Sequence, residues 1–269
     1  MTRLFRKIQS GSLALGVYIK GAPHIVPAIA KAGFDFVRPD MMFSAIDWKE
    51  MDHIVRASKL SDITPWVRVA ANPWLAGVDN LQVTVDAARA FSIGAEVVQV
   101  SVSSAKQVEA LVAVAKDWHR SAAGHYPSTR EELDAQVERI SREAIFIPSV
   151  ECKSAIEEID VITSVPGLRA LYIACTDLAE QLGHAFDYEH PEVWSTFDRI
   201  VKLARDRNVM IVANTGYIYK TRDAIAQRIK RLYDHGAQVV MVQGIEFLVE
   251  ILCADLINRV SDQMARTVH

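Results

Sequence analysis

Two carboxylates stand directly after two short apolar runs near the middle of the chain. Glu151 closes the run that begins at Ile145, and Asp177 closes the run that begins at Leu171. Apolar runs of this kind, each followed by a helical pattern, predict buried parallel strands. The carboxyl ends of parallel strands meet at the mouth of an α/β fold, where such folds bind their ligands. We therefore expect Glu151 and Asp177 to hold one divalent cation between them.

Other polar residues fall at the ends of neighbouring predicted strands. Asp40 follows the second strand, Arg68 lies near the end of the third, and Ser149 precedes the metal pair. Acids and a cation that converge on one rim indicate a small-anion site with a hard cation, Mg²⁺ or Mn²⁺, with Co²⁺ as a further option. The backbone N–H groups around Thr176 and Asp177, ahead of a short predicted helix, are placed to receive a carboxylate. We count Ser149 among the substrate contacts.

Eight strand patterns position these residues, and helical patterns alternate with them. Eight strands with about eight helices and no linker predict one (β/α)8 TIM barrel domain over residues 1–269, rather than a doubly wound open sheet. No Gly-x-Gly-x-x-Gly or Walker-type loop supports nucleotide binding. The predicted strands are Ser12–Ile19, Phe34–Arg38, Thr64–Val69, Ala95–Val100, Ala144–Val150, Leu168–Ile173, Val209–Ala213 and Gln238–Val242.

Composition excludes several classes of protein. The 269 residues are 50% hydrophobic and carry 30 Lys and Arg against 33 Asp and Glu, so a net charge of -3 does not favour nucleic acid or an anionic membrane. Three scattered cysteines are too few for a disulfide framework or a zinc site. Basic residues before the run Leu13–Ile19 imitate a signal peptide, but Lys20 closes that run without a cleavage site. We expect a soluble, cytoplasmic protein without a membrane span.

Four stretches give the chain a family resemblance from Gly16 to about Val260. The chain resembles the HpcH/HpaI aldolase and citrate lyase superfamily, which are metal-dependent (β/α)8 enzymes that make or break carbon–carbon bonds next to 2-oxo acids. The stretches are Ala32-Gly-Phe-Asp-Phe-Val37, Trp66-Val-Arg-Val69, Ser149-Val-Glu-Cys152 and Ala174-Cys-Thr-Asp-Leu-Ala-Glu-Gln-Leu-Gly183.

The resemblance implies roles for individual residues. It implies that Glu151 and Asp177 bind the metal and that Arg68 stabilises the developing enolate oxygen. It also implies that backbone near Thr176 and Asp177 holds the carboxylate of pyruvate. Members of the family generally form trimers or hexamers through their C-terminal helices, so the resemblance makes residues 245–269 the candidate contact of a homo-oligomer.

The chain departs from the family after the second strand. The family's aldolases carry Asp-x-Glu-His there, and the Asp and His form a dyad tied to proton transfer. This chain has Asp40, Met41, Met42 and Phe43 instead. Neither Met42 nor Phe43 can carry a proton. We expect an apolar wall with Phe43 against the substrate, while Asp40 orients Arg68 or assists proton transfer.

Three functions follow in order of preference. The first is a divalent-metal-dependent carbon–carbon lyase, aldolase-like, that acts on a 2-oxo acid through a metal-stabilised enolate. The second keeps the scaffold but acts as a decarboxylase, dehydratase or hydrolase of a β-oxo or β-hydroxy acid, and the third is a non-catalytic carboxylate-binding member. His125, Tyr126 and His184 are candidates to replace the lost base, and Asn72 and Trp74 are candidates to line the mouth.

Overall fold

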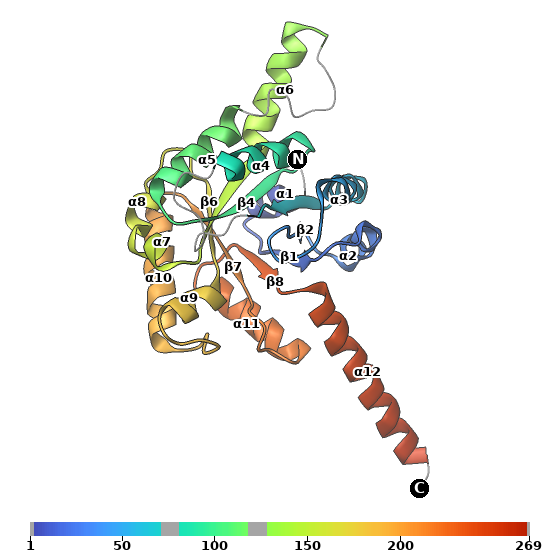
Figure 1. Cartoon of the computed structure of the whole chain (residues 1–269). Coiled ribbons are helices and arrows are strands. Elements are labelled where there is room, and N and C mark those ends of the chain that lie inside the picture. The colour runs from blue at the N-terminus through green and yellow to red at the C-terminus, as the bar shows by residue number, and fades with distance from the viewer. Residues whose placement is uncertain (1–2, 71–80, 118–127, 268–269) are drawn as a thin grey trace.

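Eight parallel strands close into a barrel in the order β1-β2-β3-β4-β5-β6-β7-β8, which confirms the predicted (β/α)8 fold (Figure 1). The computed structural model describes residues 3–70, 81–117 and 128–267. The strands are β1 (Ala14–Ile19), β2 (Phe36–Pro39), β3 (Thr64–Arg68), β4 (Val97–Val102), β5 (Ile145–Val150), β6 (Ala170–Ile173), β7 (Met210–Asn214) and β8 (Val239–Val242). The helices are α1 (Arg3–Gln9), the 3-10 turn η1 (Pro23–Ile25), α2 (Val26–Ala32), α3 (Trp48–Leu60), α4 (Leu81–Ser92), α5 (Ala105–Asp117), α6 (Arg130–Glu143), α7 (Lys153–Glu157), α8 (Ile159–Thr163), α9 (Cys175–Gln181), α10 (Pro191–Asp206), α11 (Arg222–Asp234) and α12 (Ile245–Thr267).

An aromatic layer fills the interior of the barrel below the strand ends. The rings of Phe36 and Trp66 lie 4.8 Å apart, and both side chains are fully buried. Gly16 on the adjacent strand leaves room for this layer, because a Cβ atom there would come within 2.2 Å of the Phe36 ring. The interior is therefore a packed core up to this level, and a cavity can open only above it.

Helix α1 closes the N-terminal end of the barrel. Its Leu4 and Phe5 side chains pack into the interior cluster that contains Phe36 and Trp66. The backbone N–H of Leu4 donates to Thr64 Oγ1 at 3.2 Å, where β3 begins. The basic residues that imitate a signal peptide thus belong to a helix that is part of the fold.

Helix α12 contrasts with the helices that cover the barrel. It is 23 residues long, and in Figure 1 it leaves the barrel and extends away from it to the C-terminus. Within the described residues, no helix is both long enough and apolar enough to cross a membrane.

Candidate active site

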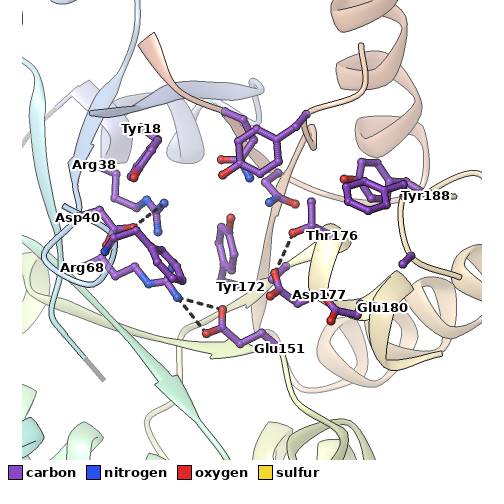
Figure 2. A pocket seen from close by; sticks show the side chains of 17 residues that line it. Tyr18, Arg38, Asp40, Arg68, Glu151, Tyr172, Thr176, Asp177, Glu180 and Tyr188 are labelled. Atoms are coloured by element: carbon purple, nitrogen blue, oxygen red, sulfur yellow. Dashed lines mark hydrogen bonds and ion pairs between the residues drawn. The ribbon is translucent and has the colours of Figure 1, made fainter. Parts of the chain in front are cut away.

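A cavity of about 320 Å³ opens at the C-terminal ends of the strands (Figure 2). Its charged lining residues are Arg38, Asp40, Arg68, Glu151, Asp177 and Glu180. Its aromatic lining residues are Tyr18, Phe43, Tyr172, Phe186, Tyr188 and Tyr217. The structure therefore brings Asp40, Arg68, Glu151 and Asp177 to one cavity, as their positions at strand ends predict.

Arg68 and Glu151 form a buried ion pair across this cavity. Arg68 Nη2 donates to Glu151 Oε1 at 2.9 Å and to Oε2 at 3.2 Å. The hydroxyl of Ser101 donates to the same carboxylate. Burial raises the pKa of Glu151, although Arg68 and Ser101 oppose the rise and the nearby charge of Asp177 adds to it. Burial disfavours the charged guanidinium of Arg68, but Glu151 and Asp40 outweigh burial and raise its pKa, so Arg68 stays a cation.

Asp40 is fixed by two arginines and by the turn that follows β2. Its Oδ2 atom lies 3.4 Å from Arg68 Nη1 and 3.3 Å from Arg38 Nη2. Its Oδ1 atom accepts the backbone N–H of Met42 at 2.7 Å and that of Phe43 at 3.1 Å. The Asp40 side chain is fully buried. The carboxylate thus holds both guanidiniums and the backbone of the next turn in one arrangement.

Phe43 and Met42 form an apolar cover over Arg68. The Phe43 ring lies 5.1 Å from the Arg68 guanidinium and is 59% exposed at the mouth of the cavity. Met42 Sδ lies 3.2 Å from Arg68 Nη2. Met41 instead packs against the main core. Among the described residues, no histidine lines the cavity.

Thr176 and Asp177 lie in the first turn of α9. The helix begins at Cys175, so both residues lie inside it rather than ahead of it. Thr176 Oγ1 donates to Asp177 Oδ2 at 2.8 Å, and Asn214 Oδ1 accepts the Cys175 N–H at 2.9 Å. First-turn N–H groups have no partner within a helix, so those of Thr176 and Asp177 are placed to meet an anion.

Ser149 does not line the cavity. It lies two residues before Glu151 on β5, fully buried, and its Oγ accepts a hydrogen bond from Gln99 Nε2 at 2.6 Å. A strand advances about 3.3 Å per residue, so Ser149 lies one layer deeper in the barrel than Glu151. It supports the site through Gln99.

His184 is also outside the cavity lining. Its Nε2 atom lies 2.8 Å from Glu192 Oε2, and its ring stacks on His190 at 3.4 Å. His190 caps α10 by accepting the Glu192 N–H at 3.2 Å. These contacts stabilise the start of α10. The other candidates for base and mouth, His125, Tyr126, Asn72 and Trp74, lie outside the described residues.

Sequence reasoning missed Arg38, Gln99, Tyr18 and Tyr172. All four lie inside strands rather than at their ends, and Arg38, Tyr18 and Tyr172 line the cavity. For two of them the sequence does carry a signal, which is a polar residue inside a buried strand. Arg38 lies on the same face of its strand as Phe36, and Gln99 lies on the same face as Val97. Burial raises the pKa of Tyr172 and of Tyr18, so both phenols keep their protons.

Comparison with known proteins gives consistent matches over most of the chain. The sequence model of the HpcH/HpaI aldolase/citrate lyase family matches residues 16–243. A 2-dehydro-3,6-dideoxy-6-sulfogluconate aldolase of Pseudomonas putida is 28% identical over 71% of this chain and 74% of its own length. A hydroxypyruvate/pyruvate aldolase of Rhizorhabdus wittichii is 29% identical over 70% and 73%.

Solved structures share the fold. An HpcH/HpaI aldolase from Desulfitobacterium hafniense superposes with a TM-score of 0.77 at 22% identity, over 97% of each chain. The citrate synthase SbnG superposes with a TM-score of 0.76 at 21% identity, over 97% of this chain and 98% of its own.

Proposed function

The chain belongs to the HpcH/HpaI aldolase/citrate lyase family, and from this premise we propose that it is a divalent-metal-dependent carbon–carbon lyase that acts on a 2-oxo acid through an enolate. Its matched relatives include aldolases of hydroxypyruvate, pyruvate and an oxo sugar acid by name. One observation carries the proposal. Glu151, Asp177 and the buried cation Arg68 line the same cavity.

The donor set fits a hard divalent cation. Glu151 and Asp177 offer carboxylate oxygens, and the charge of Asp177 contributes to the raised pKa of Glu151, as expected for two acids that lie close together. Two neighbouring carboxylates in a partly buried cavity repel each other, and a divalent cation removes that repulsion. Mg²⁺ or Mn²⁺, with Co²⁺ as a further option, is proposed at this pair. Such an ion, when bound by Glu151 and Asp177, would supply Lewis-acid polarisation of the 2-oxo group of the substrate.

The residues around the proposed metal pair divide the remaining work. Arg68 Nη2 lies beside Glu151, one of the proposed metal ligands. The guanidinium would therefore face the substrate oxygen on which enolate charge develops, and its fixed positive charge would lower the barrier by electrostatic preorganisation. Asp40 holds Arg68 in that position. The N–H groups of Thr176 and Asp177 receive the substrate carboxylate. Phe43 covers Arg68 and limits the access of water.

A second candidate function keeps the enolate and changes the bond that breaks. The absence of a histidine from the described cavity lining favours it, because decarboxylation of a β-oxo acid needs no base to deprotonate a hydroxyl group. The enzyme would then release carbon dioxide rather than an aldehyde or ketone. A product assay on a β-oxo acid separates the two chemistries.

Deuterium exchange into the methyl group of pyruvate tests the proposal, because it reports enolate formation without an acceptor. Exchange in D₂O is followed by NMR with Mg²⁺, Mn²⁺ or Co²⁺, for the wild type and for Glu151→Gln. We expect metal-dependent exchange that falls roughly 100-fold or more in Glu151→Gln. Glu157→Gln, which changes an exposed acid on α7, serves as the matched control and should exchange like the wild type.

Exchange without metal, or unchanged exchange in Glu151→Gln, would contradict the proposed roles. If metal binds but no exchange occurs, the proposal that the protein forms the enolate of pyruvate is wrong. The β-oxo acid assay then decides between altered chemistry and a non-catalytic carboxylate binder.

A further inference from the structure

Arg38 is a buried cation that the proposed function does not use. It lies on β2 beside Tyr18 of β1 and two residues before Asp40, so it sits one layer deeper in the barrel than the strand ends. Its side chain is 4% exposed and lines the cavity. Figure 2 shows its guanidinium pointing into the cavity, on the side opposite Thr176 and Asp177.

A buried network holds the Arg38 guanidinium in place. Gln99 Oε1 accepts from Arg38 Nη1 at 3.2 Å and from Trp66 Nε1 at 3.1 Å, while Gln99 Nε2 donates to Ser149 at 2.6 Å. The Gln99 amide therefore cannot turn without breaking bonds on both sides. Arg38 also lies 5.0 Å above the Tyr18 ring. The cation is preorganised before any ligand binds.

The charge of Arg38 is only partly balanced by the described residues. Its one acidic partner is Asp40 at 3.3 Å, and the same Oδ2 atom also serves Arg68 at 3.4 Å. Arg68 has Glu151 as a second acid, whereas Arg38 has a neutral amide. Arg38 Nε is buried without a hydrogen-bond partner among the described residues. A buried cation of this kind gains free energy when an anion completes its shell.

We propose that Arg38 binds a second carboxylate of the substrate, so that this enzyme prefers 2-oxo acids with a carboxylate at both ends. The proposal rests on the lyase function above, since the first carboxylate is the one held at Thr176 and Asp177. A substrate that spans the cavity then meets N–H groups and metal at one end and Arg38 at the other. Tyr18 and Tyr172 form the walls beside that second anion.

A matched pair of substrates isolates the second carboxylate. 4-Hydroxy-2-oxoglutarate and 4-hydroxy-2-oxopentanoate differ only in whether the far end carries a carboxylate or a methyl group. In both, the bond between the third and fourth carbons breaks, and its electron pair forms the pyruvate enolate. The hydroxyl proton leaves as the aldehyde forms, and a proton then adds to the enolate. Pyruvate release is measured for both by proton NMR, which resolves pyruvate from the aldehyde formed with it.

We expect kcat/KM of the wild type to favour the dicarboxylate by roughly 10- to 100-fold. Arg38→Met should remove that preference, because kcat/KM should fall further for the dicarboxylate than for the methyl analogue. Arg38→Lys should keep part of it, because it keeps the charge but loses the planar fork. Arg56→Met, on the exposed face of α3, is the control. An equal loss on both substrates would show that Arg38 is structural, and equal wild-type rates would overturn the proposal.

Calorimetry separates this inference from the lyase function. 2-Oxoglutarate and 2-oxopentanoate differ in the same way and need no turnover, so their binding with Mg²⁺ is measured directly. Tighter binding of 2-oxoglutarate that Arg38→Met abolishes supports the second-carboxylate site even if neither hydroxy acid is cleaved, and in that case the lyase proposal alone fails. Equal affinities for the two oxo acids would contradict the Arg38 proposal whatever the kinetics.

Discussion

At the scale of single residues, Phe43 is the main departure from the family's proton-transfer dyad. Its backbone N–H already donates to Asp40, and its ring covers Arg68. A histidine at this position would place an imidazole, whose pKa lies near neutral, beside a buried carboxylate. We therefore expect Phe43→His to raise the rate of pyruvate methyl exchange about tenfold or more.

The comparison variant for this prediction is Phe43→Leu, which opens the cavity without adding a proton carrier. The measurement is the pH dependence of exchange in both variants. A gain confined to the histidine variant that grows as the imidazole loses its proton supports the prediction. An equal gain in both variants would mean that access to the cavity, rather than proton transfer, limits the wild type.

The sequence predicts part of the site because strand ends share one rim in a parallel barrel. That rule places Asp40, Arg68, Glu151 and Asp177 correctly around one cavity. The rule fails for Ser149, which lies on the same face of β5 as Glu151 but one layer deeper in the barrel. The Ser149 hydroxyl accepts a hydrogen bond from Gln99 there and does not line the cavity. Which layer is still packed and which opens to the cavity depends on side chains from several strands, so no single strand pattern shows it.

At the scale of elements, Glu189 connects the loop before α10 to α11. It accepts hydrogen bonds from Tyr219 at 2.6 Å, Trp194 at 3.0 Å and Arg228 at 2.8 Å, and it also pairs with Arg231. Burial alone would raise the pKa of Glu189, but the bonds from Tyr219 and Trp194 and the two arginines outweigh it and lower the pKa. The loop, α10 and α11 are thus joined through one carboxylate.

The lowered pKa fixes the sign of a pH effect on stability. A carboxylate with a lowered folded-state pKa stabilises the fold above its ordinary pKa of 4.5, and this contribution is lost as the pH falls through the folded-state value. We expect Glu189→Gln to lower the free energy of unfolding at pH 7, because the amide loses the ion pairs with the two arginines. The expected loss is about 1 to 3 kcal/mol, and solvent limits it because the side chain is about a third exposed.

Denaturant unfolding at several pH values checks the prediction. The difference between wild type and Glu189→Gln should persist down to the ordinary pKa and narrow below it. Glu109→Gln, at an exposed acid of α5, should show no such difference. If the difference in free energy of unfolding between the wild type and Glu189→Gln does not change with pH, then packing rather than the charge of Glu189 stabilises the loop.

Strand and helix patterns reveal the barrel strands but not every helix. The alternation of apolar runs predicts all eight strands, and the closed barrel confirms them. Helix α1 is harder to recognise because only seven residues form it, and its value comes from burying Leu4 and Phe5 against distant strands. A contact between residues far apart in sequence leaves no local periodicity.

At the scale of the whole molecule, α12 exposes an apolar stripe. With about 100° between successive residues of a helix, its exposed large apolar side chains fall on one face. They are Val249, Leu252, Leu256, Ile257, Val260 and Met264. A stripe on a helix that leaves its own barrel needs a partner, and we propose that other copies of this chain cover it in a trimer or hexamer.

Light scattering after gel filtration tests the assembly. The wild type should run as a trimer or hexamer, and the double variant Leu252→Glu with Leu256→Glu should run as a single chain with an unchanged circular dichroism spectrum. Asn258→Glu adds one negative charge on the opposite face of the helix and should leave the oligomer intact. A wild type that is already monomeric would contradict the proposal.

The closed base of the barrel has a consequence for the order of events in turnover. Helix α1 and the layer of Phe36 and Trp66 fill the N-terminal end, so the cavity opens at the C-terminal end of the barrel. Under the proposed lyase function, substrate and products would share this mouth, and two fragments formed in line could not exchange places. The fragment nearer the mouth would depart first, and the one against the floor would depart second. We therefore expect the deeper fragment to be the competitive product inhibitor.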